Sequence, residues 1–175
     1  MSRYDLQAVD AGGAARSVRV THSQAEPWRV AAQVAGGLTY EGEGQDLFEA
    51  LGRVREQMQQ DALLLCCNGS RRNARPSPAM SAAGAEFVYL MPAYRLMTVR
   101  DIHPLFAPAP AEKVVGVKEQ TEYYVTKLSS RKYLIQWVNP ISWIKHLEAS
   151  IRGPKGWVLE ASGPDTVRWG SGRAR

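Results

Sequence analysis

The sequence predicts an α+β protein: a mixed sheet of about five strands with a helix packed on one face, followed by a largely helical, basic C-terminal part. Residues 17–21 and 28–34 carry strand patterns, and residues 46–60 carry an amphipathic helical pattern. Two short apolar runs follow the helical pattern, at 62–67 and 87–91. Together these segments predict a β-β-α-β-β core.

Length and composition agree with a folded domain. The chain has 175 residues, which fits about one domain. A chain of this size buries roughly 70% of the surface that it exposes when unfolded. The apolar fraction of 45% and charged fraction of 22% are ordinary for a globular protein, so disorder is not expected overall.

The sequence contains no signal for a membrane or for secretion. No stretch approaches the roughly 18 apolar residues that span a bilayer, and residues 1–10 lack the apolar segment of a secretory signal. We therefore expect no membrane insertion and a cytoplasmic location. A reducing compartment would keep the adjacent Cys66 and Cys67 as thiols, because neighbouring cysteines rarely bridge to each other.

The chain is divided by composition and pattern. We expect a flexible N-terminus at 1–16, an α+β core at 17–105, a Pro-rich connection at 106–112, a helical and hairpin subdomain at 113–170, and a basic tail at 171–175. The C-terminal subdomain could equally wrap the first part.

The first half begins with strands. Residues 17–21 alternate, with Val18 and Val20 on one face, and residues 28–34 form a second strand candidate. Gly36-Gly37 predicts a turn, after which a third strand begins at 38–40.

The helix at 46–60 has both a start signal and an apolar stripe. Asp46 can cap it, and Glu49 three residues later completes a pattern like the capping box. The stripe contains Leu47, Phe48, Leu51, Val54 and Met58. We expect this stripe to lie on a sheet.

The two apolar runs predict two more strands. The run at 62–67 is short and continuous, which is typical of a central strand covered on both faces. The run at 87–91 is a second strand. Nineteen residues separate Cys67 from Phe87, and long connections in compact domains are often functional or mobile.

The C-terminal third has weaker patterns. Thr98 and Asp101 predict a short helical turn, and a helix is expected at 117–128 with Val117, Tyr124, Val125 and Leu128 facing inward. The segment 132–138 fits a strand or a helix, and 139–152 predicts a helix that begins at Asn139-Pro140. A hairpin is expected from 157–160 and 166–169.

The segment 66–77 is the best candidate for binding. An apolar strand leads into a loop with three arginines and several small polar residues, whose backbone N–H groups and guanidinium forks suit an anion. The candidate residues, for an anion or an acidic partner, are Asn68, Ser70, Arg71, Arg72, Asn73 and Arg75. The other interpretation is a solvated loop whose arginines pair with Glu41, Glu43 or Asp46.

Catalytic and metal sites are not predicted. Cys66 or Cys67 could serve as a nucleophile only with a base such as His22, His103 or His146, and packing of both thiols is the simpler interpretation. The histidines and cysteines lack metal-ligand spacing, so we expect no metal and no cofactor.

The charge is unevenly distributed. The net charge is +5, with a net of −1 over residues 1–112 and +6 over residues 113–175. The last third also contains tyrosines and tryptophans among its basic residues, which would suit stacking on bases and neutralising phosphates.

These observations leave three hypotheses. The first is a non-catalytic protein-binding module, such as an inhibitor or immunity-type protein, that docks by charge complementarity with Trp137 and Trp157 as candidate anchors. The second is a nucleic-acid-binding protein that uses the C-terminal third. The third is an enzyme acting on an anionic small molecule at the 66–77 loop. The expected partner is another protein, and the sequence makes no prediction of the oligomeric state.

Overall fold

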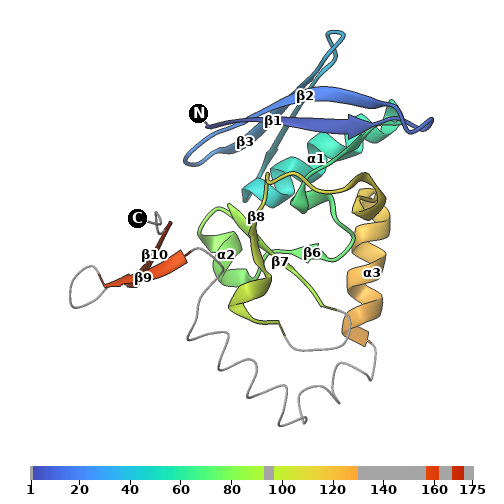
Figure 1. Cartoon of the computed structure of the whole chain (residues 1–175). Helices are drawn as coiled ribbons and strands as arrows, with labels where there is room; N and C mark the ends of the chain where they lie inside the picture. Colours follow the sequence, from blue (N-terminus) through green and yellow to red (C-terminus); the bar gives the residue numbers. More distant parts are fainter. Residues whose placement is uncertain (1, 93–96, 130–156, 162–166, 172–175) are drawn as a thin grey trace. The chain divides into compact units, whose positions relative to one another are not determined.

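The computed structural model describes residues 2–92, 97–129, 157–161 and 167–171 (Figure 1). The chain divides into two units. The first contains Met1–Leu90 and His103–Ser129, and the second contains Met91–Ile102 and Ser130–Arg175. The Pro-rich stretch at 106–112 therefore lies inside the first unit.

A five-stranded antiparallel sheet forms the centre of the first unit. Its strands are β1 (Ser2–Val9), β2 (Ala15–His22), β3 (Trp28–Val34), β4 (Thr39–Gly44) and β5 (Leu64–Leu65). They are arranged in the order β4-β3-β2-β1-β5, and every pair is antiparallel. The expected α+β class is confirmed, and the sheet is purely antiparallel rather than mixed.

Helix α1 (Leu47–Gln60) covers one face of this sheet (Figure 1). The Asp46 side chain accepts a hydrogen bond of 2.8 Å from the backbone N–H of Glu49, which confirms the predicted cap. The core between helix and sheet is apolar because alternate strand residues point inward. It includes Leu6, Val18, Val20, Val30, Val34, Leu47, Leu51, Val54 and Met58.

The expectation of a flexible N-terminus at 1–16 is wrong for most of that segment. Strand β1 pairs with β2 along its whole length, from Ser2 opposite His22 to Val9 opposite Ala15. The Asp10 carboxylate closes the turn by accepting hydrogen bonds from two backbone N–H groups, those of Gly12 and Ala14. The buried Leu6 and Ala8 alternate with exposed residues, and this period of two was the signal in the sequence.

The apolar run at 62–67 is not a central strand. Its regular part is only β5, which lies at the edge of the sheet and pairs with β1 alone. In the rest of the run, Ala62 is exposed, Leu63 and Cys67 pack into the main core, and Cys66 joins a smaller cluster with Ala109 and Val114. The run is apolar because part of it packs into the core that α1 shares and part of it packs against the segment at 109–114, not because it lies between two helical layers.

The run at 87–91 belongs to a second, smaller sheet. Strand β7 (Phe87–Leu90) lies between β6 (Ala74–Arg75) and β8 (Ile102–Pro104). The long connection before β7 is structured, with a 3₁₀ turn η1 (Asn68–Ser70) and a short helix α2 (Pro78–Ala82) that Ser77 caps. The five expected strands are thus divided between two sheets.

Helix α3 (Val117–Ser129) confirms the expected helix at 117–128, and the turn η3 (Ala111–Lys113) precedes it. Its buried face was predicted only in part. Tyr124 is partly buried, but Val125 is 57% exposed, and the buried residue is the polar Gln120. The side chain of Leu128 lies outside the described residues.

Among its described residues, the second unit contains only short elements. The predicted turn is present as η2 (Val99–Asp101), and Thr98 and Asp101 form its capping box. Strands β9 (Trp157–Ala161) and β10 (Val167–Ser171) pair antiparallel, with Trp169 opposite Leu159, which confirms the expected hairpin pairing. The segments predicted at 132–138 and 139–152 and the tail at 172–175 lie outside the described residues. No helix in the described part of the chain is long and apolar enough to cross a membrane.

Candidate functional site

The first residues of the predicted binding loop hold the fold together. Asn68 is 6% exposed, and its Nδ2 atom donates to the carbonyl of Pro104 at 3.2 Å. Ser70 is 1% exposed, with its Oγ atom 3.2 Å from the Sγ atom of Cys67. Neither side chain is available to a ligand. The candidate surface is therefore reduced to the loop from Arg71 onward.

The buried side chains of Arg55 and Gln120 hold the backbone of this loop in place by hydrogen bonds. The Nη1 atom of Arg55 in α1 donates to the Oε1 atom of Gln120 in α3 at 2.7 Å and to the carbonyl of Gly69 at 3.1 Å. Its Nη2 atom donates to the carbonyl of Val115 at 2.8 Å. The two side chains are 4% exposed each, so these bonds form away from water.

Gln120 extends the same network into the loop. Its Nε2 atom donates to the carbonyls of Gly69 and Arg71 at 3.0 and 2.7 Å, with a longer contact of 3.4 Å to Ala74. The loop backbone is thus fixed to α1 and α3 at several points. Burial lowers the pKa of Arg55 to about 10, and no described carboxylate forms an ion pair with it.

Two of the three loop arginines, Arg72 and Arg75, lie beside aromatic rings. The guanidinium carbon of Arg72 is 4.9 Å from the centre of the Tyr123 ring, and that of Arg75 is 4.4 Å from the Tyr124 ring. Arg75 also lies 5.8 Å from the ring of Phe48 in α1. These contacts orient the cations without neutralising them.

Arg71 is partly buried. Its Nε atom is buried and has no hydrogen-bond partner among the described residues, and burial lowers the pKa of its guanidinium group. Arg72 is exposed, whereas Asn73 and Arg75 are partly buried.

The alternative of self-paired arginines does not match the described contacts. Glu43 pairs with Arg29 at 2.9 Å, and Asp46 caps α1. Within the described ranges, no ion pair includes Arg71, Arg72 or Arg75. The loop therefore presents cationic groups that the described carboxylates leave without a salt bridge.

A recess of about 550 Å³ opens beside Arg75, between α1, α3 and the start of α2. Its lining is amphipathic: aromatic and proline rings form part of the wall, and charges of both signs stand around it. The main lining residues are Phe48, Gly52, Arg53, Glu56, Arg75, Pro76, Pro78, Thr121 and Tyr124, with Arg55 and Gln120 beneath. Such a mixture can hold an apolar group that also carries a charge.

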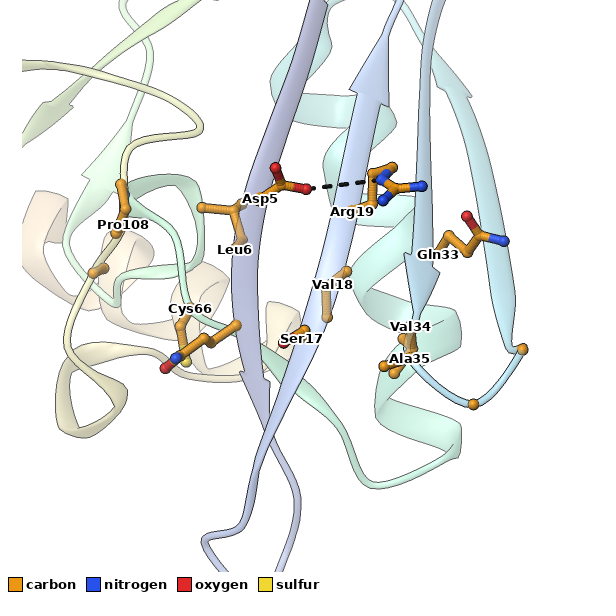
Figure 2. A pocket seen from close by; sticks show the side chains of 14 residues that line it. Asp5, Leu6, Ser17, Val18, Arg19, Gln33, Val34, Ala35, Cys66 and Pro108 are labelled. Atoms are coloured by element: carbon orange, nitrogen blue, oxygen red, sulfur yellow. Dashed lines mark ion pairs between the residues drawn. The ribbon is translucent and has the colours of Figure 1, made fainter.

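A larger hollow, of about 700 Å³, lies against strands β1, β2 and β3 of the five-stranded sheet (Figure 2). It includes Arg19 and Asp5, whose side chains pair across β2 and β1 with 3.7 Å between Nε and Oδ1. Cys66 and Pro108 lie at its edge. The charged groups here already satisfy each other, so the hollow offers weaker attraction to a ligand than the recess does.

Neither cysteine has the surroundings of a nucleophile. Cys67 is fully buried, and burial raises the pKa of its thiol. Burial also raises the pKa of Cys66. A reactive thiol needs the opposite shift.

The structure describes the remaining candidates only in part. His22 is 3% exposed, and its Nδ1 atom lies 2.6 Å from the carbonyl of Ser23. Of the predicted anchors, Trp157 begins β9 and Trp137 lies outside the described residues. Among the residues with described positions, no group of three or more histidine, cysteine or acidic side chains could hold a metal.

Comparison of the chain with protein-family models and with curated proteins finds no match.

The sequence interpretation missed three residues of this site. Arg55 lies within the apolar stripe of α1, one residue after Val54 and three before Met58, so its position signalled a buried cation. Gly52 lies inside the same helix, where glycine lowers helix stability relative to alanine, so its presence there indicated a role for the missing side chain. Gln120 gave no signal, because a polar residue in an exposed helix is ordinary.

Proposed function

We propose that this chain is a non-catalytic protein-binding module that docks on an acidic surface of another protein. The contact surface is the arginine surface, defined as Arg71, Arg72 and Arg75 with the rings of Tyr123, Tyr124 and Phe48. The observation that carries the proposal is the state of these arginines: Arg72 and Arg75 are held beside aromatic rings, and none of the three forms an ion pair with a described carboxylate. Binding of this kind is the chemistry of inhibitors and immunity-type proteins.

Preorganisation supports this proposal. An arginine on a flexible loop loses side-chain entropy when it binds, and a stacked guanidinium loses less. The backbone under the loop is fixed by Gln120, and Arg72 and Arg75 lie against α3. Arginines with tyrosines are also the residue types enriched at binding hot spots.

The mixed charge near the surface favours a protein over a nucleic acid. Asp46, Glu49 and Glu56 line the recess beside Arg75. A phosphate backbone would meet these carboxylates as well as the arginines, with repulsion offsetting attraction. A protein can place acidic groups on the arginines and basic or neutral groups elsewhere.

Capture of the partner tests the proposal. Immobilised wild-type protein is exposed to a lysate of the organism that encodes it, in parallel with the double variant Arg72→Ala/Arg75→Ala. The matched control is Arg16→Ala/Arg29→Ala, which removes the same charge from exposed arginines that already pair with Asp10 and Glu43. We expect one protein to be recovered in stoichiometric amount by wild type and control, and not by the double variant.

Two results would contradict the proposal. Recovery of the same proteins by wild type and by Arg72→Ala/Arg75→Ala would remove the arginine surface from consideration. Loss of recovery after nuclease treatment would favour the nucleic-acid alternative, which also predicts binding that falls steeply with salt. Thermal unfolding of each variant establishes that the loss of binding is not a loss of folding.

A further inference from the structure

We propose that the recess beside Arg75 is a pocket for one side chain and its acidic neighbour on the partner: an aromatic or aliphatic residue next to a glutamate or aspartate. This inference rests on the proposed function and specifies which chemistry the partner presents. Three observations support it: Gly52 leaves space on α1, aromatic and proline rings line the recess, and the Arg75 guanidinium lies beside them.

Gly52 is the first observation. Phe48, Gly52 and Glu56 lie four residues apart on one face of α1, and all three line the recess. A glycine inside a helix destabilises it relative to alanine. Packing does not require this glycine, because a Cβ atom built at Gly52 has no heavy atom within 4 Å. Its effect is to leave the recess open.

The walls indicate what enters. Rings of Phe48, Tyr124, Pro76 and Pro78 surround the space, so an aromatic or aliphatic side chain can bury its apolar surface there. The guanidinium carbon of Arg75 lies 5.8 Å from the centre of the Phe48 ring and 4.4 Å from that of Tyr124, and Arg75 lines the same recess. A carboxylate on the neighbouring residue can accept hydrogen bonds from it.

The charges at the rim favour a carboxylate over a phosphate. Arg53 is paired with Glu49 at 2.9 Å, and the buried Arg55 is bound to Gln120 and to backbone carbonyls. Arg75 is therefore the cation in the lining whose side chain has neither an ion pair nor a hydrogen bond with a described residue. Glu56 adds a negative charge to the same lining. A carboxylate brings one negative charge to the one guanidinium in the lining without a described partner, whereas a doubly charged phosphate would bring a second negative charge close to Glu56.

A pair of dipeptides tests this pocket. The probes are acetyl-Phe-Glu-amide and its neutral counterpart acetyl-Phe-Gln-amide, titrated into the full-length ¹⁵N-labelled protein and followed by NMR chemical shifts. We expect the acidic dipeptide to shift the amide signals of Gly52 and Thr121 and the Nε–H signal of Arg75. The neutral dipeptide should bind at least about tenfold more weakly, because its amide oxygen can still accept a hydrogen bond from Arg75 but lacks the negative charge that strengthens it.

Substitution of the glycine gives the decisive comparison. Gly52→Leu places a side chain in the recess from a position where the Cβ atom has no heavy atom within 4 Å and the helix gains propensity, so the variant should fold. It should bind the acidic dipeptide at least about tenfold more weakly than wild type. The control Gln60→Leu adds the same side chain at an exposed site of α1 that does not line the recess, and it should bind as wild type does.

Three results would overturn the inference: no shift with the acidic dipeptide, equal binding of both dipeptides, or undiminished binding by Gly52→Leu. Inorganic phosphate is titrated separately, and shifts at Gly52 and Thr121 as strong as those with the dipeptide would mean a simple anion site instead. If partner capture still depends on Arg72 and Arg75 while the dipeptide does not bind, only the pocket is wrong. If capture does not depend on those arginines, the proposed function is wrong.

Discussion

Arg55 and Gln120 meet inside the protein, with 2.7 Å between Nη1 of the first and Oε1 of the second, although 65 positions separate them in the chain. The pair joins α1 to α3, and both side chains also bind backbone carbonyls of the loop at 69–71. A buried guanidinium that contacts neutral oxygens is costly unless each contact is made. This buried pair therefore fixes the backbone of the loop that carries the arginine surface.

Gln120→Ala should lower the free energy of unfolding by about 2 to 4 kcal/mol. The substitution removes an acceptor from the buried Arg55 guanidinium and a donor from the carbonyl of Arg71, and such groups are expensive to leave unsatisfied. Urea denaturation measures the change. The neighbouring Thr121→Ala, whose hydroxyl donates to Val117 at an exposed site, should cost less than about 1 kcal/mol. A loss below about 1 kcal/mol for Gln120→Ala would mean that water replaces the side chain.

The fold was predictable from the sequence where the signals are local, and the long-range pairing of Arg55 with Gln120 was not. Helix α1 was predictable because a capping aspartate and an apolar stripe are local signals. Strands β2 and β3 were predictable from their alternation. The division of the strands between two sheets was not, since a run such as 87–91 has the same pattern whichever sheet it joins.

The candidate site was predictable to a similar extent. The arginine loop was visible as composition, but its support was not, because Gln120 comes near the loop only through the fold. Asn68 and Ser70 are polar residues of the same loop and turn inward, and a sequence of mixed polar residues does not indicate which of them face solvent.

Stability should fall between about pH 10 and pH 12 because of Tyr40. Burial, together with a hydrogen bond of 2.7 Å from its hydroxyl to the Asp61 carboxylate, raises the pKa of Tyr40 to about 12. An unfolded tyrosine loses its proton near pH 10, so the folded state holds more protons in this interval and its stability declines as pH rises. The decline should be on the order of 2 kcal/mol.

The comparison with Tyr40→Phe isolates this effect. The variant lacks the hydroxyl, so it should be less stable at neutral pH by about 1 kcal/mol and should lack Tyr40's share of the decline above pH 10. Urea denaturation at several pH values from 8 to 11.5 measures both proteins. An identical pH dependence in wild type and variant would show that Tyr40 titrates normally.

Native protein should react with at most one equivalent of a thiol reagent such as Ellman's reagent. Cys67 is fully buried with its Sγ atom against Ser70, whereas Cys66 lines the hollow on the sheet. Reaction at Cys66 should be slow, because burial raises its pKa and reduces the thiolate fraction. Unfolding in urea should release the second equivalent, and Cys66→Ala should abolish the native reaction. Fast labelling of two thiols in the native state would restore the nucleophile hypothesis.

Replacement by alanine should change the free energy of unfolding in opposite directions at Gly52 in α1 and at Gly42 in the adjacent strand β4. Gly52→Ala should raise the free energy of unfolding by about 0.5 to 1 kcal/mol, because alanine favours the helix and its methyl group enters open space. Gly42→Ala should lower it by about 1 to 3 kcal/mol, because β4 passes so close to α1 that the new methyl group would collide with the backbone carbonyl of Ala50. Urea denaturation of both variants measures the pair. A destabilised Gly52→Ala would mean that packing does require the glycine, and the argument that Gly52 keeps the recess open would lose its basis.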